Sequence, residues 1–210
     1  MNSSKRDFDK EAMTWETAPR LKLAGDVAGA MFKQLKLTPD MDVLDFGCGT
    51  GLIALQFAPY VRSVTGADTS KGMLEVFQNK AKTKSLDNVK SCHLGLTDEE
   101  VFFGPYHLIT SSMTLHHVKD TQKIMEQFYR VLLPGGRIAI ADLDEEGGRF
   151  HDNNDGVFHF GFNREKLSRL FLEAGFIDIS FMTAACMNKP GLDGQDRVFN
   201  IFLVTARKVS

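Results

Sequence analysis

The 210-residue chain has few cysteines, and their spacing excludes the common uses of paired thiols. Only Cys48, Cys92 and Cys186 occur, and no two of them form a C-x-x-C pair. A zinc ribbon or a thioredoxin-like redox site is therefore not supported. An odd number of widely spaced thiols is typical of a reducing compartment, so we expect a cytoplasmic protein.

Long apolar runs and an excess of charge of one sign are also lacking. No segment approaches the roughly 18 consecutive apolar residues that a membrane-spanning helix requires, and the polar start has no apolar core of a secretion signal. The 25 basic and 27 acidic residues give a net charge of −2, whereas general nucleic-acid binding needs a clustered basic surface. We therefore expect neither a membrane nor a nucleic acid as a partner.

Two periodicities alternate along the chain and predict an α/β fold in a single domain over residues 1–210. The strands are expected at residues 42–46, 63–67, 89–94, 107–111, 137–143, 176–184 and 198–206, and the helices at 23–35, 52–58, 70–81, 121–132 and 163–174. We expect residues 1–37 to form an N-terminal cap and helix, and residues 143–162 to form an active-site loop. The last two strands, joined by a loop over residues 185–197, predict an antiparallel hairpin at one edge of the sheet.

The most informative segment is a glycine-rich turn that directly follows the first predicted strand. Asp45 is followed by Gly47, Gly49 and Gly51 at alternate positions. Ligands of open α/β sheets bind at the carboxyl ends of the strands, where glycine lets the backbone approach a ligand closely. A dinucleotide fingerprint would need its third glycine at Leu52, and no G-K-[ST] of a phosphate-binding loop follows.

This D-x-G-x-G-x-G pattern resembles the first motif of the class I S-adenosylmethionine-dependent methyltransferases. Residues 106–118 resemble the family's fourth strand and the segment after it, and residues 132–137 resemble its L-x-P-G-G turn. Residues 8–20 resemble its N-terminal cap. The similarity is greatest to the small-molecule branch. It implies a Rossmann-like, mostly parallel sheet of seven strands in the order 3-2-1-4-5-7-6, with strand 7 antiparallel and helices on both faces.

The resemblance implies that S-adenosyl-L-methionine binds along the strand ends and leaves as S-adenosyl-L-homocysteine. A carboxylate such as Asp45 can receive the cofactor's ammonium group, and Asp68, at the end of the second strand, would bind the ribose. Gly95 stands where the family often has an acid that contacts the adenine. The implied cofactor-binding residues are Asp45, Gly47, Cys48, Gly49, Gly51, Asp68, Thr69, Met73, Gly95, Leu96, Ser111, Ser112 and Met113.

The expected reaction is an in-line displacement that carries a methyl group to a small-molecule acceptor. A base is needed only if the acceptor loses a proton, and His117 is the preferred candidate over its neighbour His116. We expect no metal, although residues 142–159 carry several acids and histidines. A non-catalytic S-adenosylmethionine-binding protein and a protein methyltransferase remain as alternatives. The acceptor, its reacting atom and the oligomeric state are not indicated by the sequence.

Overall fold

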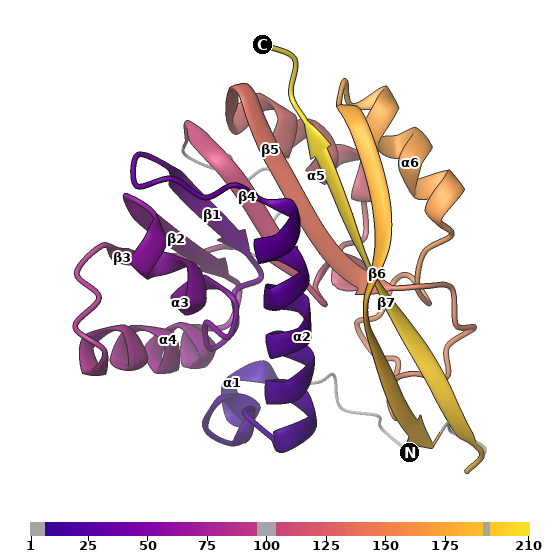
Figure 1. The fold of residues 1–210 in the computed structure, drawn as a ribbon. Coiled ribbons are helices and arrows are strands. Elements are labelled where there is room, and N and C mark those ends of the chain that lie inside the picture. The colour runs from indigo at the N-terminus through magenta and orange to yellow at the C-terminus, as the bar shows by residue number, and fades with distance from the viewer. Residues whose placement is uncertain (1–6, 96–103, 191–193) are drawn as a thin grey trace.

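The computed structural model describes residues 7–95, 104–190 and 194–210, and its strands form one seven-stranded sheet (Figure 1). The strand order is β3-β2-β1-β4-β5-β7-β6, as predicted. Only β7 runs antiparallel to its neighbours β5 and β6. The strands are β1 (Asp42–Phe46), β2 (Ser63–Asp68), β3 (Val89–His93), β4 (Tyr106–Ser112), β5 (Leu132–Leu143), β6 (Ile177–Pro190) and β7 (Asp196–Arg207).

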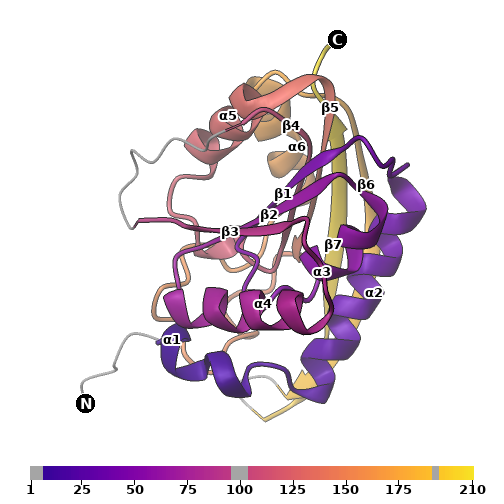
Figure 2. The same cartoon turned by 90° about the vertical axis from the view of Figure 1, so that its left-hand side faces the viewer.

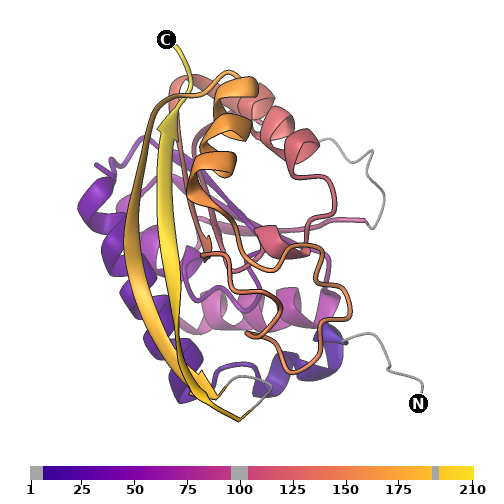
Figure 3. The same cartoon turned by 90° about the vertical axis from the view of Figure 1, so that its right-hand side faces the viewer.

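Helices cover both faces of the sheet, as expected for a mostly parallel sheet (Figures 2 and 3). The first face packs against α2 (Ala18–Gln34), α3 (Ala54–Phe57) and α4 (Lys71–Thr83) in one apolar cluster. The opposite face packs against α5 (Thr121–Val131) and α6 (Arg164–Glu173) in a second cluster. Short helical turns complete the chain: α1 (Phe8–Glu11), η1 (Ala12–Thr14), η2 (Ala58–Tyr60) and η3 (Leu115–His117).

Side-chain caps fix where the helices behind the strands begin. The Ser70 hydroxyl accepts a hydrogen bond from the Met73 amide at the start of α4, and Asn163 caps α6 in the same way. Both caps satisfy amides that have no partner inside the helix. Gly175, with a φ of 98°, follows α6 in the left-handed region that commonly ends a helix. These local signals explain why these helix starts were predicted within a residue or two.

Three predicted boundaries were wrong. The N-terminal helix begins at Ala18 rather than Leu23, with Pro19 in its first turn, where a missing amide costs nothing. The predicted helix over residues 52–58 is instead the short α3 followed by η2. β5 begins at Leu132 rather than Arg137, because Leu132 already pairs with Tyr106 and the proline-glycine segment forms an irregularity in the pairing.

The edge hairpin is also longer than predicted, because most of the expected loop over residues 185–197 is paired strand. The pairing of β5 with β7 ends at the pair Leu143 and Ile201. The pairing of β6 with β7 continues beyond this point, to the pair Pro190 and Asp196. The hairpin end therefore projects past the sheet toward the level of α1 (Figures 1 and 3). Residues 185–190, Ala-Cys-Met-Asn-Lys-Pro, do not alternate strictly between apolar and polar side chains, which is the pattern from which a half-buried strand is recognised.

The carboxyl ends of β1, β2 and β4 meet at one edge of the sheet, where the chain passes from each strand into a loop. Residues 7–20, called the N-terminal segment below, lie at this same edge (Figure 1). So do residues 144–162, which connect β5 to α6. Among the described residues, no helix is both long and apolar enough to cross a membrane.

Candidate functional site

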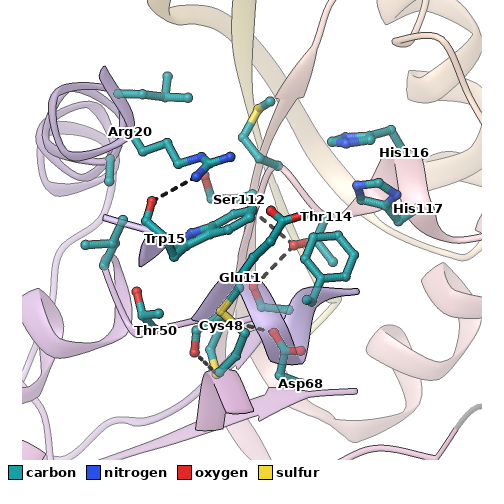
Figure 4. Close-up of a pocket in the computed structure, with 18 of the residues that line it drawn as sticks. Glu11, Trp15, Arg20, Cys48, Thr50, Asp68, Ser112, Thr114, His116 and His117 are labelled. Carbon is teal, nitrogen blue, oxygen red and sulfur yellow. Dashed lines mark hydrogen bonds between the residues drawn. The ribbon is translucent and has the colours of Figure 1, made fainter. Parts of the chain in front are cut away.

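A pocket of about 910 Å³ opens at this edge of the sheet (Figure 4). Its walls come from several separate parts of the chain. These include the N-terminal segment, the glycine turn after β1, the β2–α4 connection, the segment from the end of β4 through η3, the β5–α6 connection and the end of the β6–β7 hairpin. The hairpin contributes Met187 and Lys189, which could not be anticipated when this part of the chain was expected to be a loop. A volume of this size is at the upper end for a small-molecule site.

The glycine turn forms the floor of the pocket in a conformation that requires glycine. Gly47 has a φ of 68°, and a Cβ placed there would lie 2.2 Å from the Thr114 side chain. Gly49 has a φ of 52°, yet a Cβ there would meet nothing within 4 Å. The Gly47 amide donates to the Ala67 carbonyl over 2.8 Å and so ties the turn to β2. The exposed backbone of this turn can therefore approach a ligand closely.

Two carboxyl groups lie behind and beside the turn, and both are desolvated. Asp45 is only 2% exposed and accepts a 2.7 Å hydrogen bond from Thr110. Burial, reinforced by the nearby negative charge of Asp68, raises the pKa of Asp45 to about 7. Burial also raises the pKa of Asp68, although the amides of Ser70 and Gly49 donate to its two oxygens over 2.9 and 2.8 Å. A bound cation would relieve the cost of ionising Asp45.

Polar contacts fasten the N-terminal segment over the pocket. The Asp9 carboxylate accepts hydrogen bonds from the Ser70 hydroxyl and the Gly72 amide, which lie at the start of α4. Farther along, Glu16 accepts a 2.7 Å bond from Thr50 of the glycine turn and forms an ion pair with Lys80.

Aromatic rings on the same N-terminal segment line the pocket. Trp15 lies under the Arg20 guanidinium, whose carbon is 3.9 Å from the ring centre, and both side chains face the pocket in Figure 4. Phe8 packs edge-on against Trp15 and against His117. The segment thus supplies an apolar wall and one guanidinium to the pocket.

Histidines gather at the other end of the pocket from Asp68 (Figure 4). His116 is fully buried, and its Nδ1 lies 2.7 Å from the equally buried Asp142 at the end of β5. Although burial alone would raise it, the pKa of Asp142 is lowered by the charge and hydrogen bonds of His116. His151, from the β5–α6 connection, places its Nε2 3.1 Å from the His116 Nε2. His117 donates from Nδ1 to the Gly156 carbonyl over 2.8 Å, since a carbonyl can only accept.

Comparison with known proteins identifies the family to which the chain belongs. Residues 37–175 match the family described as Methyltransferase domain. The chain belongs to this family of S-adenosylmethionine-dependent methyltransferases. It is 32% identical over 163 residues to an uncharacterized methyltransferase of Schizosaccharomyces pombe, and this match covers 70% of this chain and 57% of the relative. It is also 30% identical over 116 residues to a demethylmenaquinone methyltransferase of Listeria welshimeri, and this match covers 54% of this chain and 49% of that enzyme.

A solved structure supports the same assignment of the fold. Phosphoethanolamine N-methyltransferase 2 of Haemonchus contortus, in complex with S-adenosyl-L-methionine, superposes with a TM-score of 0.70. The match has 22% identity and covers 87% of this chain and 52% of that one. The chain therefore spans about half the length of the curated relatives and of this solved neighbour.

The methyltransferase domain has residues that fit S-adenosylmethionine, the cofactor of the family. The cofactor carries an ammonium group, and the desolvated carboxyl of Asp45 is hydrogen-bonded by the neutral groups of Thr110 and Ala54 rather than compensated by a positive charge from them. Asp68 faces the same pocket with carboxylate oxygens that can accept from hydroxyl groups. Gly49 leaves open space where any other residue would place a side chain. These features agree with a zwitterionic nucleoside along the strand ends.

The structure brings most of the predicted cofactor-binding residues to the pocket wall. These are Asp45, Gly47, Cys48, Gly49, Asp68, Thr69, Met73, Ser112 and Met113, together with the predicted base His117. Burial raises the pKa of Cys48 well above its ordinary value, so this residue contributes shape and backbone groups rather than a thiolate.

Three predicted residues lie away from this wall, and a fourth cannot be placed. Gly51 has a φ of 82° and faces Phe77 of α4, so its role in the structure is close packing. The Ser111 hydroxyl donates to the Phe46 carbonyl and joins β4 to β1. Gly95 follows the wall residue Leu94, and Leu96 lies outside the described residues.

Sequence reasoning missed the pairing of Asp142 with His116 and the contributions of Thr114, Glu11 and Lys189 to the pocket. One signal for the pairing was present. Asp142 is an acid within the last residues of an apolar strand, and a buried acid requires a partner.

Proposed function

We propose that this methyltransferase domain transfers a methyl group to a small-molecule acceptor by in-line displacement. The observation that carries the proposal is one continuous pocket of about 910 Å³ that holds Asp45 and Asp68 at one side and the histidines at the other. Such a volume accommodates a cofactor and a small second ligand. The 30% identity of this chain to a demethylmenaquinone methyltransferase agrees with a small-molecule acceptor.

S-adenosylmethionine, when bound, supplies a methyl group that is already activated on a sulfonium. The chain's own residues then have to orient the two ligands and keep water out. The N-terminal segment is placed for both tasks, because Asp9 and Glu16 fasten it to α4 and the glycine turn, and Phe8 and Trp15 present apolar rings to the pocket.

His117 remains the proposed base for an acceptor that loses a proton. Its Nδ1–H is held by the Gly156 carbonyl, so the lone pair of the neutral ring is on Nε2. The ring also lines the pocket and packs against Phe8. Replacing His117 with Ala is expected to lower kcat at least about 100-fold while leaving cofactor affinity unchanged. An unchanged kcat would show that His117 does not act as the base.

The test of the whole proposal follows a labelled methyl group. Purified protein is incubated with methyl-labelled S-adenosylmethionine and, separately, with a metabolite extract and with a protein extract. Label in the metabolite fraction supports the proposal, and its loss with Asp68→Ala shows that this site is responsible. Label in the protein fraction instead would indicate a protein methyltransferase. Cofactor binding without transfer to either fraction would indicate a non-catalytic binding protein.

A cytoplasmic location is part of the same proposal. It is supported by the three cysteines, which are all free thiols in the structure, as expected in a reducing compartment. Fractionation of the source cells, followed by detection of the protein, checks this assignment.

A further inference from the structure

We infer that His116, His117 and His151 form a binding site for a divalent transition-metal ion at the acceptor end of the pocket. Each histidine offers a ring nitrogen, and these three atoms all lie within 4.8 Å of one another. No other such group of histidine, cysteine or acidic side chains occurs within residues 7–95, 104–190 and 194–210. The site goes beyond methyl transfer, and it also departs from our sequence-based expectation that no metal is used.

His116 has the environment of a metal ligand whose ring orientation is fixed by a carboxylate. Its Nδ1 lies 2.7 Å from a carboxylate oxygen of Asp142, and its own backbone amide donates to the second oxygen over 3.2 Å. Asp142 further accepts a 2.7 Å bond from the Leu143 amide, so the carboxylate is fixed. Metal-bound histidines almost always donate their other ring N–H to such a carboxylate or to a carbonyl. This leaves the lone pair of the neutral His116 ring on Nε2.

His117 and His151 complete the set from different directions. His117 donates from Nδ1 to the Gly156 carbonyl, the second kind of partner that fixes the ring of a metal ligand. His151 reaches in from the β5–α6 connection, and its Nε2 lies 3.1 Å from the His116 Nε2. Two imidazole nitrogens this close must share a proton or a cation, because two lone pairs would repel each other.

The spacing suits a metal ion with small adjustments of the rings. Nitrogen ligands at about 2.1 Å from a tetrahedral Zn²⁺ lie about 3.4 Å from one another. The His116–His151 separation is already close to this value, and the third nitrogen has to move by on the order of 1 Å. Three imidazoles with no thiolate favour Zn²⁺ and similar ions over Mg²⁺ or Ca²⁺, which prefer oxygen ligands.

A three-histidine site of this kind keeps one coordination position open, as catalytic zinc sites do. All three histidines line the pocket, so the open position faces the space assigned to the acceptor. An acceptor with an oxygen or nitrogen donor could bind there, and coordination would lower the pKa of a bound hydroxyl. In the metal-bound state His117 Nε2 is a ligand, so the metal replaces it as the activating group.

Metal binding can be measured without any methyl acceptor. The full-length protein is stripped with EDTA, dialysed, and titrated with Zn²⁺ in competition with a chromophoric chelator. We expect one equivalent to bind. His117→Ala and His151→Ala should each weaken binding at least about tenfold, and Asp142→Asn should weaken it by roughly 10–100-fold by loosening His116. Co²⁺ in place of Zn²⁺ should give a visible absorption band that the same variants lose.

The matched control is His93→Ala, which removes an exposed histidine outside the cluster and should leave the affinity unchanged. Thermal melting of the stripped variants confirms that each is folded. Absence of stoichiometric binding, or binding by His117→Ala and His151→Ala as tight as that of the wild type, overturns the site. Full methyl transfer by the stripped protein without such binding would also overturn it, while leaving the proposed function intact. Metal binding without methyl transfer would support the site and count against the proposed function.

Discussion

The Asp9 carboxylate accepts a 2.6 Å hydrogen bond from the Ser70 hydroxyl, 61 residues farther along the chain. Ser70 is also the cap of α4, and the Gly72 amide in the first turn of that helix donates to the same Asp9 oxygen. One carboxylate therefore joins the N-terminal segment to the start of the helix beside the pocket. An acid in this position also suits the positive end of the helix dipole.

Asp9→Ala should loosen the N-terminal segment and speed release of the cofactor. We expect the Kd for S-adenosylhomocysteine to rise roughly three- to tenfold through a faster dissociation rate, because two hydrogen bonds to a charged group are lost. Stopped-flow dissociation measures this. Asp9→Asn, which keeps an acceptor oxygen, should recover part of the effect, and Asp26→Ala on the exposed side of α2 should have none. Equal rates for Asp9→Ala and wild type would show that the contact does not hold the segment closed.

Asp68→Ala should abolish most of the cofactor affinity with little effect on folding. The side chain accepts amides from Gly49 and Ser70 and faces the pocket, so its removal loses both the turn geometry and the proposed ribose contact. We expect the Kd to rise by about 100-fold. Titration calorimetry measures the affinity, with Asp87→Ala as a matched, exposed acid. A Kd within twofold of wild type contradicts the ribose assignment.

The pKa of Asp45 predicts how stability depends on pH. The folded protein holds the proton up to about pH 7, whereas an ordinary aspartic acid loses it near 3.8. The unligated protein therefore loses stability as the pH rises from about 4 to 7, because the carboxyl ionises in the unfolded chain while burial keeps it protonated in the folded protein. Asp45→Asn should become more stable relative to wild type across that interval, by on the order of 4 kcal/mol at most. Urea unfolding at several pH values gives the difference, and a constant difference contradicts the shift.

The same group links cofactor binding to proton release. A cationic ammonium beside Asp45 lowers its pKa, so binding near pH 7 should expel a proton in the wild type. Calorimetry in two buffers with different ionisation enthalpies reports the number of protons released. We expect a fraction of one proton for the wild type and none from this position in Asp45→Asn. Equal release by both proteins would place the ammonium elsewhere.

Gly47→Ala should be far more damaging than Gly49→Ala. Both positions have positive φ, so each alanine is strained by about 1 kcal/mol. Only at Gly47 does the added carbon collide with Thr114, which should cost at least about 2 kcal/mol more. The double variant Gly47→Ala/Thr114→Gly removes the obstructing side chain and should restore part of the stability. Thermal unfolding of the wild type, Gly47→Ala, Thr114→Gly and the double variant completes the cycle, and additive effects of the two substitutions would show that no collision occurs.

The parallel sheet and the glycine turn could be predicted because their signals are local. Short apolar runs mark the buried strands, and the positive-φ glycines at 47, 49 and 51 lie within five consecutive residues. Caps such as Ser70 likewise act within three residues. These features require no knowledge of distant contacts.

The rest of the site depends on contacts between distant residues. His116 and His151 are 35 residues apart, and His151 belongs to a connection without regular periodicity. Nothing in the sequence near His116 indicates that Asp142 lies behind it. The hairpin end was missed because residues 185–190 do not alternate strictly between apolar and polar side chains. Only the folded chain shows that Lys189 reaches the pocket.

The projecting end of β6 and β7 gives this domain a way to diversify. Met187 and Lys189 border the pocket, yet they are far in the chain from the turn and carboxylates that we expect to bind the nucleoside. Exchanging this ribbon among related proteins would alter which compounds are accepted while the nucleoside-holding half stays unchanged. Engineering of new acceptor preference should therefore start at residues 185–190 rather than at the strand ends.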